Sequence, residues 1–346
     1  MKVAIIYDGV ATDWTEEEIA SVMRPVHEIA GILAGEGHTV TRVGVRHDLR
    51  WLARVRRVDL VINLCEGING IGKWEDLVTA TLELAGIPFT GCRSWTITVC
   101  HHKGLVNALL QAHGLPVPRW VVPKGFRVPR DFPLPAIVKP AAEDASVGIE
   151  QASVVTTRSA LETRVAQLSE TFDEVLVQEF IDGREFAVGF VGNVTLPVSE
   201  IDFSGMPRGA WRILSFQGKW EKGHVEDVGS RPVCPAPIDK DLEKRLIATA
   251  QAAWRTVGGS GYGRVDLRVD AAGRPWVLEV NPNPDISDDA GLSAMAQAKG
   301  WSYSELILRM FETTRAAVQR RESVDRIAGN RTARPARRGA RKATPA

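Results

Sequence analysis

The chain of 346 residues has few cysteines, almost no net charge and no long apolar run. Its four cysteines contain no CxxC pair, which argues against a disulfide framework and favours reduced thiols. The formal net charge of +1 gives no general attraction to nucleic acid or to a membrane surface. No apolar run has the roughly 20 residues that cross a bilayer. The N-terminal MKVAIIYDGV is typical of a first strand and not of a signal peptide. We therefore expect a cytoplasmic protein with neither a membrane nor a nucleic-acid partner.

Strand and helix signals alternate in the first third of the chain. Apolar runs at residues 2–9, 58–64 and 87–91 are typical of strands, and the segments 15–38 and 74–86 between them have helical periodicity. This alternation predicts a parallel, doubly wound sheet. Ligands bind such a sheet beyond the carboxyl ends of its strands, so the glycine-rich loop after the second strand is a candidate binding segment.

A predicted hairpin in segment 261–287, GYGRVDLRVDAAGRPWVLEVNPNPDIS, carries polar residues on one face. Its strands place Asp266 opposite Glu279, and Arg264 opposite Asn281. Like charges that face each other weaken a sheet, but Mg²⁺ binds one or two carboxylates together with phosphate oxygens. The pattern therefore indicates a magnesium site, with Arg264 beside it to stabilise a transferring phosphoryl group. The alternative is a solvated polar face on which the arginines form ion pairs.

The same register predicts which residues of the hairpin reach the core. It pairs Val269 with Trp276 across the turn. Because side chains alternate along a strand, the face opposite to the polar one is then formed by Val265, Leu267, Val269, Trp276, Leu278 and Val280. We expect this second face to be buried.

Three earlier segments have features of a nucleotide site. Lys139 ends an apolar strand before the small-residue loop 141–148, whose backbone N–H groups could bind phosphates although the GxxxxGK[ST] motif is absent. The strand in VLVQEFIDGREF offers an apolar edge to an adenine ring, with Glu185 near the ribose. Lys219 lies in a glycine-flanked segment. Taken singly, each has an ordinary alternative: a surface lysine, a plain turn or a core strand.

The order of these residues along the chain resembles the ATP-grasp ligases, and specifically the D-alanine–D-alanine ligase group. The resemblance covers most of residues 60–312 and depends on LELAGIPFTG, PAIVKPAAEDASVGI, VLVQEFIDGREFAVGFVG, VCPAPI and the hairpin. It implies an α/β and α+β fold, in which a doubly wound parallel sheet (a pre-ATP-grasp domain) precedes a two-lobed ATP-grasp fold. The implied units are the N-terminal domain 1–94, the central lobe 95–185, the C-terminal lobe 186–322 with the magnesium site, and a disordered basic tail 323–346.

The resemblance also implies roles for individual residues. ATP would be bound by Lys103, Lys139, Ala145, Ser146, Val147, Gln178, Glu179, Phe180, Ile181, Glu185 and Lys219. Two Mg²⁺ ions, which Mn²⁺ could replace, would be bound by Asp266, Glu279 and Asn281. Arg264 and Lys219 would be catalytic, and amino-acid-like substrates would contact Glu75, Asp285 and Gly291.

The implied reaction transfers the γ-phosphoryl group of ATP to a carboxylate, after which an amine attacks the acyl phosphate and phosphate leaves. Departures from the family pattern are concentrated in the amino-acid sites: Asp285 replaces a glycine, and Gly291 and Ala145 each replace a serine. We therefore expect a carboxylate–amine ligase of small molecules, as a homodimer as is usual in the group. The alternatives are a genuine D-alanine–D-alanine ligase of peptidoglycan synthesis and a non-catalytic ATP-binding regulatory module.

Overall fold

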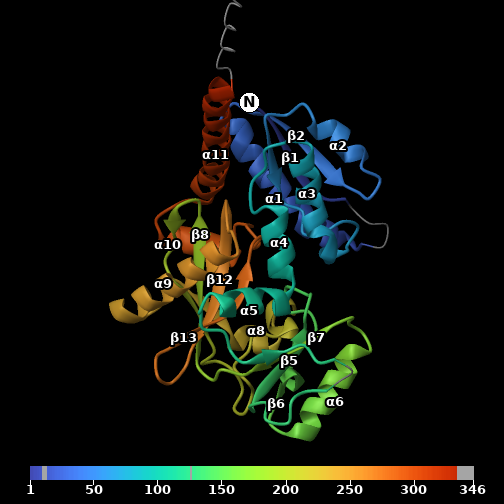
Figure 1. The fold of residues 1–346 in the computed structure, drawn as a ribbon. Helices are drawn as coiled ribbons and strands as arrows, with labels where there is room; N and C mark the ends of the chain where they lie inside the picture. Colours follow the sequence, from blue (N-terminus) through green and yellow to red (C-terminus); the bar gives the residue numbers. More distant parts are fainter. Residues whose placement is uncertain (10–13, 125–126, 333–346) are drawn as a thin grey trace, which may run out of the picture.

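The structure, a computed structural model, describes residues 1–9, 14–124 and 127–332, and it describes side chains up to residue 320. Within these ranges the chain forms three sheets that follow one another along the sequence. Figure 1 shows the N-terminal sheet at one end of the molecule, the four-stranded sheet at the other end and the six-stranded sheet between them. None of the helices in the described ranges is long and apolar enough to cross a membrane.

The N-terminal sheet is parallel and covered on both faces, as the alternating pattern predicts. Strand β1 (Lys2–Asp8) lies between β2 (Thr39–Val45) and β3 (Leu60–Asn63). Alternate residues of β1 point to opposite faces, so Val3 and Ile5 pack with one side and Ala4 and Ile6 with the other. The helical elements of this part are α1 (Glu16–Gly35), α2 (Arg50–Val55), the short 3₁₀ helix η1 (Gly72–Trp74) and α3 (Glu75–Leu84).

The four-stranded sheet is antiparallel, in the order β4-β7-β5-β6. Leu161 and Val165, on one side of helix α6 (Arg158–Ser169), pack against the buried valines of this sheet. The elements of this part are α4 (Ser94–His101), α5 (Lys103–Ala112), β4 (Trp120–Val121), β5 (Ala136–Pro140), η2 (Gln151–Ser153), β6 (Val154–Val155), α6 (Arg158–Ser169) and β7 (Val175–Glu179).

The six-stranded sheet is also antiparallel, in the order β11-β10-β8-β12-β13 with β9 paired to β8. Its strands are β8 (Arg184–Val191), β9 (Val194–Thr195), β10 (Ser199–Asp202), β11 (Arg231–Val233), β12 (Tyr262–Val269) and β13 (Pro275–Asn281). The helices among and after them are α7 (Phe216–Trp220), α8 (Val225–Gly229), α9 (Lys240–Thr256), α10 (Gly291–Ala298) and α11 (Tyr303–Thr332).

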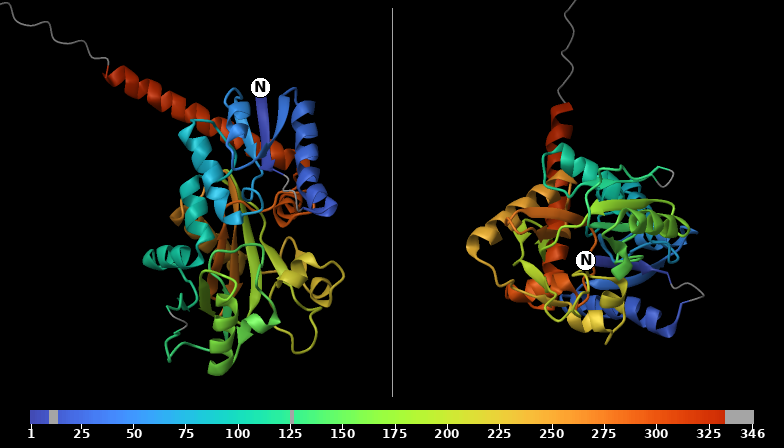
Figure 2. Two further views of the ribbon diagram at one scale, coloured as in Figure 1. Left: turned by 90° about the vertical axis from the view of Figure 1, so that its right-hand side faces the viewer. Right: turned by 90° about the horizontal axis from the view of Figure 1, so that it is seen from below.

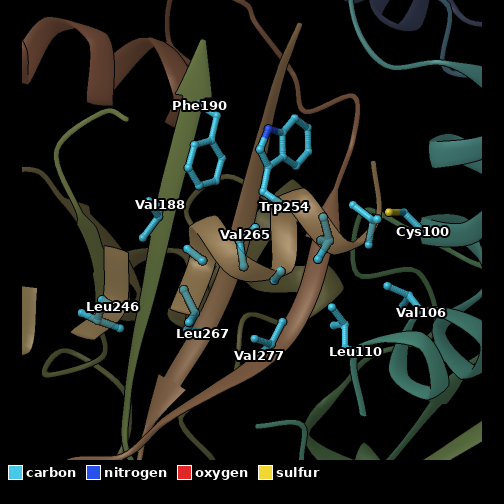
Figure 3. Packing of buried hydrophobic residues seen from close by; sticks show 14 of the residues in the cluster. Cys100, Val106, Leu110, Val188, Phe190, Leu246, Trp254, Val265, Leu267 and Val277 are labelled. Carbon is cyan, nitrogen blue, oxygen red and sulfur yellow. The ribbon is translucent and has the colours of Figure 1, made fainter. Parts of the chain in front are cut away.

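One apolar cluster joins this sheet to helices from two parts of the chain. Figure 3 shows Val265 and Leu267 of β12 facing Trp254 of α9, with Leu110 of α5 beside them. The rings of Phe190 and Trp254 stack with centroids 5.4 Å apart. Burying a side chain of this kind stabilises a fold by about 1.5–3 kcal/mol. The cluster therefore fixes the polar face of the hairpin relative to α5, whose first residue is a predicted phosphate ligand.

The hairpin of β12 and β13 has the predicted pairs at its polar end but not at its turn. Arg264 pairs with Asn281 and Asp266 pairs with Glu279, which confirms the predicted facing carboxylates. The register then shifts, so that Val269 pairs with Pro275 instead of Trp276. A β-bulge of this kind opposes two residues of one strand to one residue of the other and breaks the alternation of side chains.

The bulge makes the predicted core face of β13 wrong at two positions. Val277 and Val280 are buried in the core, whereas Leu278 lines a cavity on the polar side. The Trp276 indole donates a hydrogen bond from Nε1 to Asp270 Oδ2 at 2.8 Å instead of entering the core.

Helix α11 packs at its start and projects at its end. Leu306, Ile307, Met310 and Phe311 join the core around α1, and Figure 2 shows the later turns of the helix leaving the body of the molecule. The helix continues to Thr332, so residues 323–332 are helical where the sequence predicts a disordered tail. A helix that is anchored by packing can extend beyond its apolar residues, because propagation adds one hydrogen bond per residue. Residues 333–346 lie outside the described part.

Candidate active site

A cavity of about 140 Å³ lies where the four-stranded and six-stranded sheets meet. The residues around it come from β5 and β7 on one side and from β12 and β13 on the other. The predicted site residues that line it are Lys139, Ala145, Ser146, Gln178, Glu179, Phe180, Ile181, Glu185, Lys219, Arg264, Asp266, Glu279 and Asn281. Lys103 lies next to it, with Nζ 3.8 Å from Glu279 Oε1. Val147 is not among the lining residues, although it belongs to the same loop as Ala145 and Ser146.

The wall of the cavity around Gln178 is largely apolar. Ile137, Phe180 and Ile213 line it, and the Phe180 ring meets Trp211 edge-on with centroids 5.3 Å apart. The Nε2 atom of Gln178 is buried and has no hydrogen-bond partner within the described residues. A slot of apolar side chains with one unpaired polar group fits a flat heteroaromatic ring.

Glu185, the predicted ribose ligand, forms an ion pair with Arg268. The Arg268 Nε and Nη2 atoms donate to Glu185 Oε2 at 3.0 and 2.8 Å. The arginine is 3% exposed and also donates from Nη1 to the carbonyl of Ile181 at 3.0 Å. Its guanidinium lies 4.8 Å from the centroid of the Phe180 ring. Arg268 therefore fixes both the acid and the backbone of the β7–β8 connection.

Each of the facing carboxylates has a cationic neighbour. Arg264 donates from Nε and Nη2 to the two oxygens of Asp266 at 2.7 and 2.9 Å. Burial raises the pKa of Glu279, and the charge of Lys103 opposes that rise. The ion pairing that the sequence left open as an alternative is thus present at Asp266. One hydrogen bond to a carboxylate oxygen leaves further acceptor capacity on the same oxygen.

The oxygen atoms of three cavity residues fit a magnesium ion. Asp266, Glu279 and Asn281 supply two carboxylates and a carboxamide, and Asn281 Oδ1 accepts a hydrogen bond from the backbone N–H of Asn283 at 3.0 Å, which orients it. Among the described residues, no group of three or more His, Cys, Asp or Glu could hold a metal by itself. Mg²⁺ does not require such a group, because phosphate oxygens and water complete its coordination.

The predicted phosphate lysines are held in unlike environments. Burial lowers the pKa of Lys139 to about 8, and it also lowers the pKa of Lys219. Burial acts in the same direction on Lys103, but Glu279 and Asp144 outweigh it, so that the pKa of Lys103 is raised. Lys103 also donates to the carbonyl of Glu143 and lies 3.1 Å from Asp144 Oδ1. A phosphate would supply the anion that Lys139 and Lys219 lack.

The small-residue loop 141–148 and the segment that carries Lys219 contact each other beside the cavity. Trp220 donates from Nε1 to the carbonyl of Ala145, and Ser146 donates from Oγ to the carbonyl of Leu214, both at 2.9 Å. Ala145 and Ser146 have φ angles of 56° and 64°, in the left-handed region that is unfavourable for residues with a side chain. Such strain is typical of ligand-binding loops.

More than half of the sequence matches a known family. The family model of the D-ala D-ala ligase C-terminus matches residues 109–312, which is more than half of the chain. A D-alanine–D-alanine ligase of Gluconobacter oxydans is 32% identical over 318 residues, covering 88% of this chain and 96% of the relative. This chain belongs to the D-alanine–D-alanine ligase family. It is therefore an ATP-dependent carboxylate–amine ligase that forms a C–N bond, as the sequence predicts.

Other members support the same assignment. A D-alanine–D-alanine ligase of Chromohalobacter salexigens is 32% identical over 237 residues, covering 67% of this chain and 71% of the relative. The crystal structure of the D-alanine–D-alanine ligase from Bacillus anthracis complexed with ATP has a TM-score of 0.73 at 22% identity and covers 93% of this chain and 99% of that one. The VanG D-Ala:D-Ser ligase from Enterococcus faecalis has a TM-score of 0.70 at 23% identity, covering 90% and 99%. These structural matches confirm the fold.

The residues predicted to contact the substrates of this family member do not line the cavity. Glu75 begins α3 and accepts a hydrogen bond from His101 at 2.7 Å. Asp285 lies in the loop before α10, where its Oδ1 accepts from the N–H and hydroxyl of Ser287 at 2.8 and 2.7 Å. Gly291 is the first residue of α10, and a Cβ there would lie 4.0 Å from Arg264 Nη1. Gly291 therefore lies next to the cavity residue Arg264.

Sequence reasoning missed several lining residues, above all Arg268 and Leu278. The polar face of β12 predicts Arg268 as an ion-pairing arginine, which its pair with Glu185 confirms, but does not predict it as a cavity residue. Leu278 could not be predicted, because the bulge that turns it to the cavity has no sequence signal of its own.

Proposed function

We propose that the protein phosphorylates the carboxylate of one amino-acid-like substrate with ATP and then joins it to the amine of a second. The observation that carries this proposal is the meeting of Lys139, Lys219 and Arg264 with Asp266 and Glu279 around one cavity between two sheets. Cations of this kind stabilise a transferring phosphoryl group, and the acids provide oxygen ligands for divalent metal.

In this proposal the nucleotide lies along β7 with its phosphates toward β5. Gln178 donates from its unpaired Nε2 to the adenine ring, and Glu185 accepts from the ribose hydroxyls. Lys103 and Lys139 bind the α- and β-phosphates, and Lys219 binds the γ-phosphate. The lowered pKa of Lys139 supports this arrangement, because an incoming phosphate offsets the cost of a buried ammonium.

Asp266, Glu279 and Asn281 would hold two Mg²⁺ ions, or Mn²⁺ in their place. Bound there, the metal would neutralise phosphate charge and orient the terminal phosphate for transfer. The carboxylate oxygen of the substrate forms the new bond to phosphorus as the bond to ADP breaks. The neutral amine then attacks the acyl carbon, and Arg264 stabilises the oxyanion of the tetrahedral intermediate. Phosphate leaves with the former carboxylate oxygen and takes up the proton that the amine loses. The contacts of Trp220 and Ser146 keep water from the acyl phosphate.

The names of the relatives make D-alanine a candidate for both substrates, so a D-alanine–D-alanine ligase is the second candidate function. The complete set of lysines, arginine and acids argues against a module that only binds ATP. We further propose the division into units 1–94, 95–185 and 186–322, a homodimer, and action in the cytoplasm, where ATP is supplied, without a nucleic-acid or membrane partner.

The test is phosphate release by the full-length protein with ATP, MgCl₂ and pairs of amino acids, with products identified by mass. Release that requires amino acids and yields a dipeptide supports the proposal. Lys139→Met should strongly reduce it at limiting ATP, whereas Lys244→Met, at an exposed lysine of α9, should not. Binding of ATP without release for any pair would favour the regulatory module instead.

A further inference from the structure

Four carboxylates gather at the carboxyl ends of the N-terminal strands, outside the nucleotide cavity. Asp8 ends β1, Glu66 follows β3, Glu75 begins α3, and Asp285 belongs to the loop before α10. We call these four residues the acidic cluster. Although Glu66 is partly exposed to solvent, desolvation by the surrounding chain, followed by the charges of Asp285, Glu75 and Asp8, raises its pKa to about 7.

Hydrogen bonds hold the two halves of the acidic cluster together. Asn283, in the loop that carries Asp285, donates from Nδ2 to the carbonyl of Cys65 at 3.0 Å, directly before Glu66. Tyr262 donates to Asn283 Oδ1 at 2.7 Å. The nearness of Asp285 and Glu66 is therefore a consequence of the fold and not of a chance side-chain rotamer.

The buried side of the acidic cluster has carboxylate oxygens without partners. Glu75 is 6% exposed; its Oε2 accepts from His101, while its Oε1 is buried and has no hydrogen-bond partner within the described residues. Asp8 Oδ1 is in the same condition. Glu75 acts electrostatically on both Asp8 and Glu66. A buried acceptor that is left unpaired is costly, so these oxygens require a donor.

The solvent side of the acidic cluster is open, because Glu66 and Asp285 are exposed. The cations around the cluster are few. His101 is shared by Glu75 and Asp144, and Lys219, which acts on Glu66, is assigned to the γ-phosphate. A zwitterionic amino acid brings one ammonium group, which one carboxylate can neutralise. The acidic cluster has four carboxyl groups, and the pKa values of Asp8 and Glu66 are raised to about 7, so the cluster can accommodate more positive charge than this one ammonium brings.

We propose that the acidic cluster binds an amino-acid substrate with a second cationic group on its side chain, a diamino acid or a guanidino acid. The inference rests on the proposed function and names the substrate class of the same active site. An ammonium has three donors and no acceptor, which matches the free Oε1 of Glu75, the free Oδ1 of Asp8 and the exposed Glu66 and Asp285. The substrate's carboxylate then points toward Arg264 and the first residue of α10.

The test compares cationic and neutral side chains of equal length. Both enantiomers of lysine and ornithine are compared with norleucine and norvaline in the phosphate-release assay with ATP and MgCl₂. We expect KM for the diamino acids to be about tenfold to hundredfold lower, as for a charge-assisted hydrogen bond. Glu66→Gln and Asp285→Asn should each remove most of this preference. Glu312→Gln, on the exposed side of α11, is the matched control.

Binding is measured separately, as the rise in unfolding temperature on adding each amino acid to the protein with ADP and MgCl₂. A larger rise with lysine than with norleucine, lost in Glu66→Gln, supports the inference even if turnover is slow. Equal KM values and equal shifts in unfolding temperature for lysine and norleucine would overturn the inference. Phosphate release with neutral amino acids would still support the proposed ligase activity. If no pair releases phosphate, the proposed function fails, and the temperature shifts alone decide the inference.

Discussion

Replacing Lys139 should raise the stability of the folded protein and weaken its binding of ATP. The side chain is 7% exposed, and burial lowers its pKa from 10.5 to about 8. At about 1.4 kcal/mol for each pH unit, the charged form is disfavoured in the folded protein by about 3 kcal/mol. Methionine has a similar length and no charge, so Lys139→Met should remove this cost.

The sign of the effect depends on pH. Below about pH 8 the lysine is protonated in the folded and unfolded states, and the whole cost is present. Between about pH 8 and 10.5 the unfolded chain binds more protons, so the stability of the wild type rises with pH. The free energy of unfolding of the variant should therefore exceed that of the wild type by up to about 3 kcal/mol at pH 7, and the difference should shrink as the pH rises from about 8 to 10.5.

Urea unfolding at pH 7 and at pH 10.5 measures this difference directly, with Lys244→Met as the control because that lysine is 78% exposed at its side chain. The same variant should raise KM for ATP at least about tenfold, since a charged contact to phosphate is lost. A Lys139→Met protein that is less stable than the wild type at pH 7, or whose difference does not vary with pH, would refute the reasoning.

Three further predictions concern the groups around the cavity. Arg268→Met should leave Glu185 as an unpaired, largely buried charge and lower the free energy of unfolding by about 3–5 kcal/mol, measured by urea unfolding. Arg268→Lys should lower the free energy of unfolding by less. An equal loss in the two variants would contradict a role for the two hydrogen bonds of Arg268 to Glu185. Trp220→Phe removes the hydrogen bond to Ala145 and should raise the ratio of phosphate to joined product, because water reaches the acyl phosphate; an unchanged ratio would exclude a role in closure. Glu279→Gln should raise the magnesium concentration for half-maximal activity about tenfold or more, and an unchanged requirement would remove this residue from the metal site.

The sequence predicts the fold well where its signals are local. Alternation of side chains was enough to pair Asp266 with Glu279, because the strands are regular up to that point. The parallel N-terminal sheet also follows from a local pattern, since each strand and helix has its own periodicity. The resemblance then provided the order of the elements and the ATP-grasp fold, which alternation alone does not specify.

The sequence does not predict contacts between segments that are far apart in the chain. The bond between Trp220 and Ala145 joins residues far apart in the chain, and nothing in either segment predicts it. The acidic cluster was missed for the same reason at Asp8 and Glu66, although both stand at carboxyl ends of parallel strands, where ligands bind. Their meeting with Asp285 depends on packing between the first and the last third of the chain.

The bulge in β13 gives the two ends of one hairpin separate geometries. Between the turn and Leu278, the loop from Asp270 to Arg274 sets which residues of β12 and β13 pair. Beyond Leu278, the pair of Asp266 and Glu279 sets the register. A loop of different length could thus be accommodated during evolution without turning the acidic ligands away from the nucleotide. Deleting Leu278 would restore simple alternation and leave Glu279, Val280 and Asn281 on their present faces, because Leu278 and Glu279 both point to the cavity side.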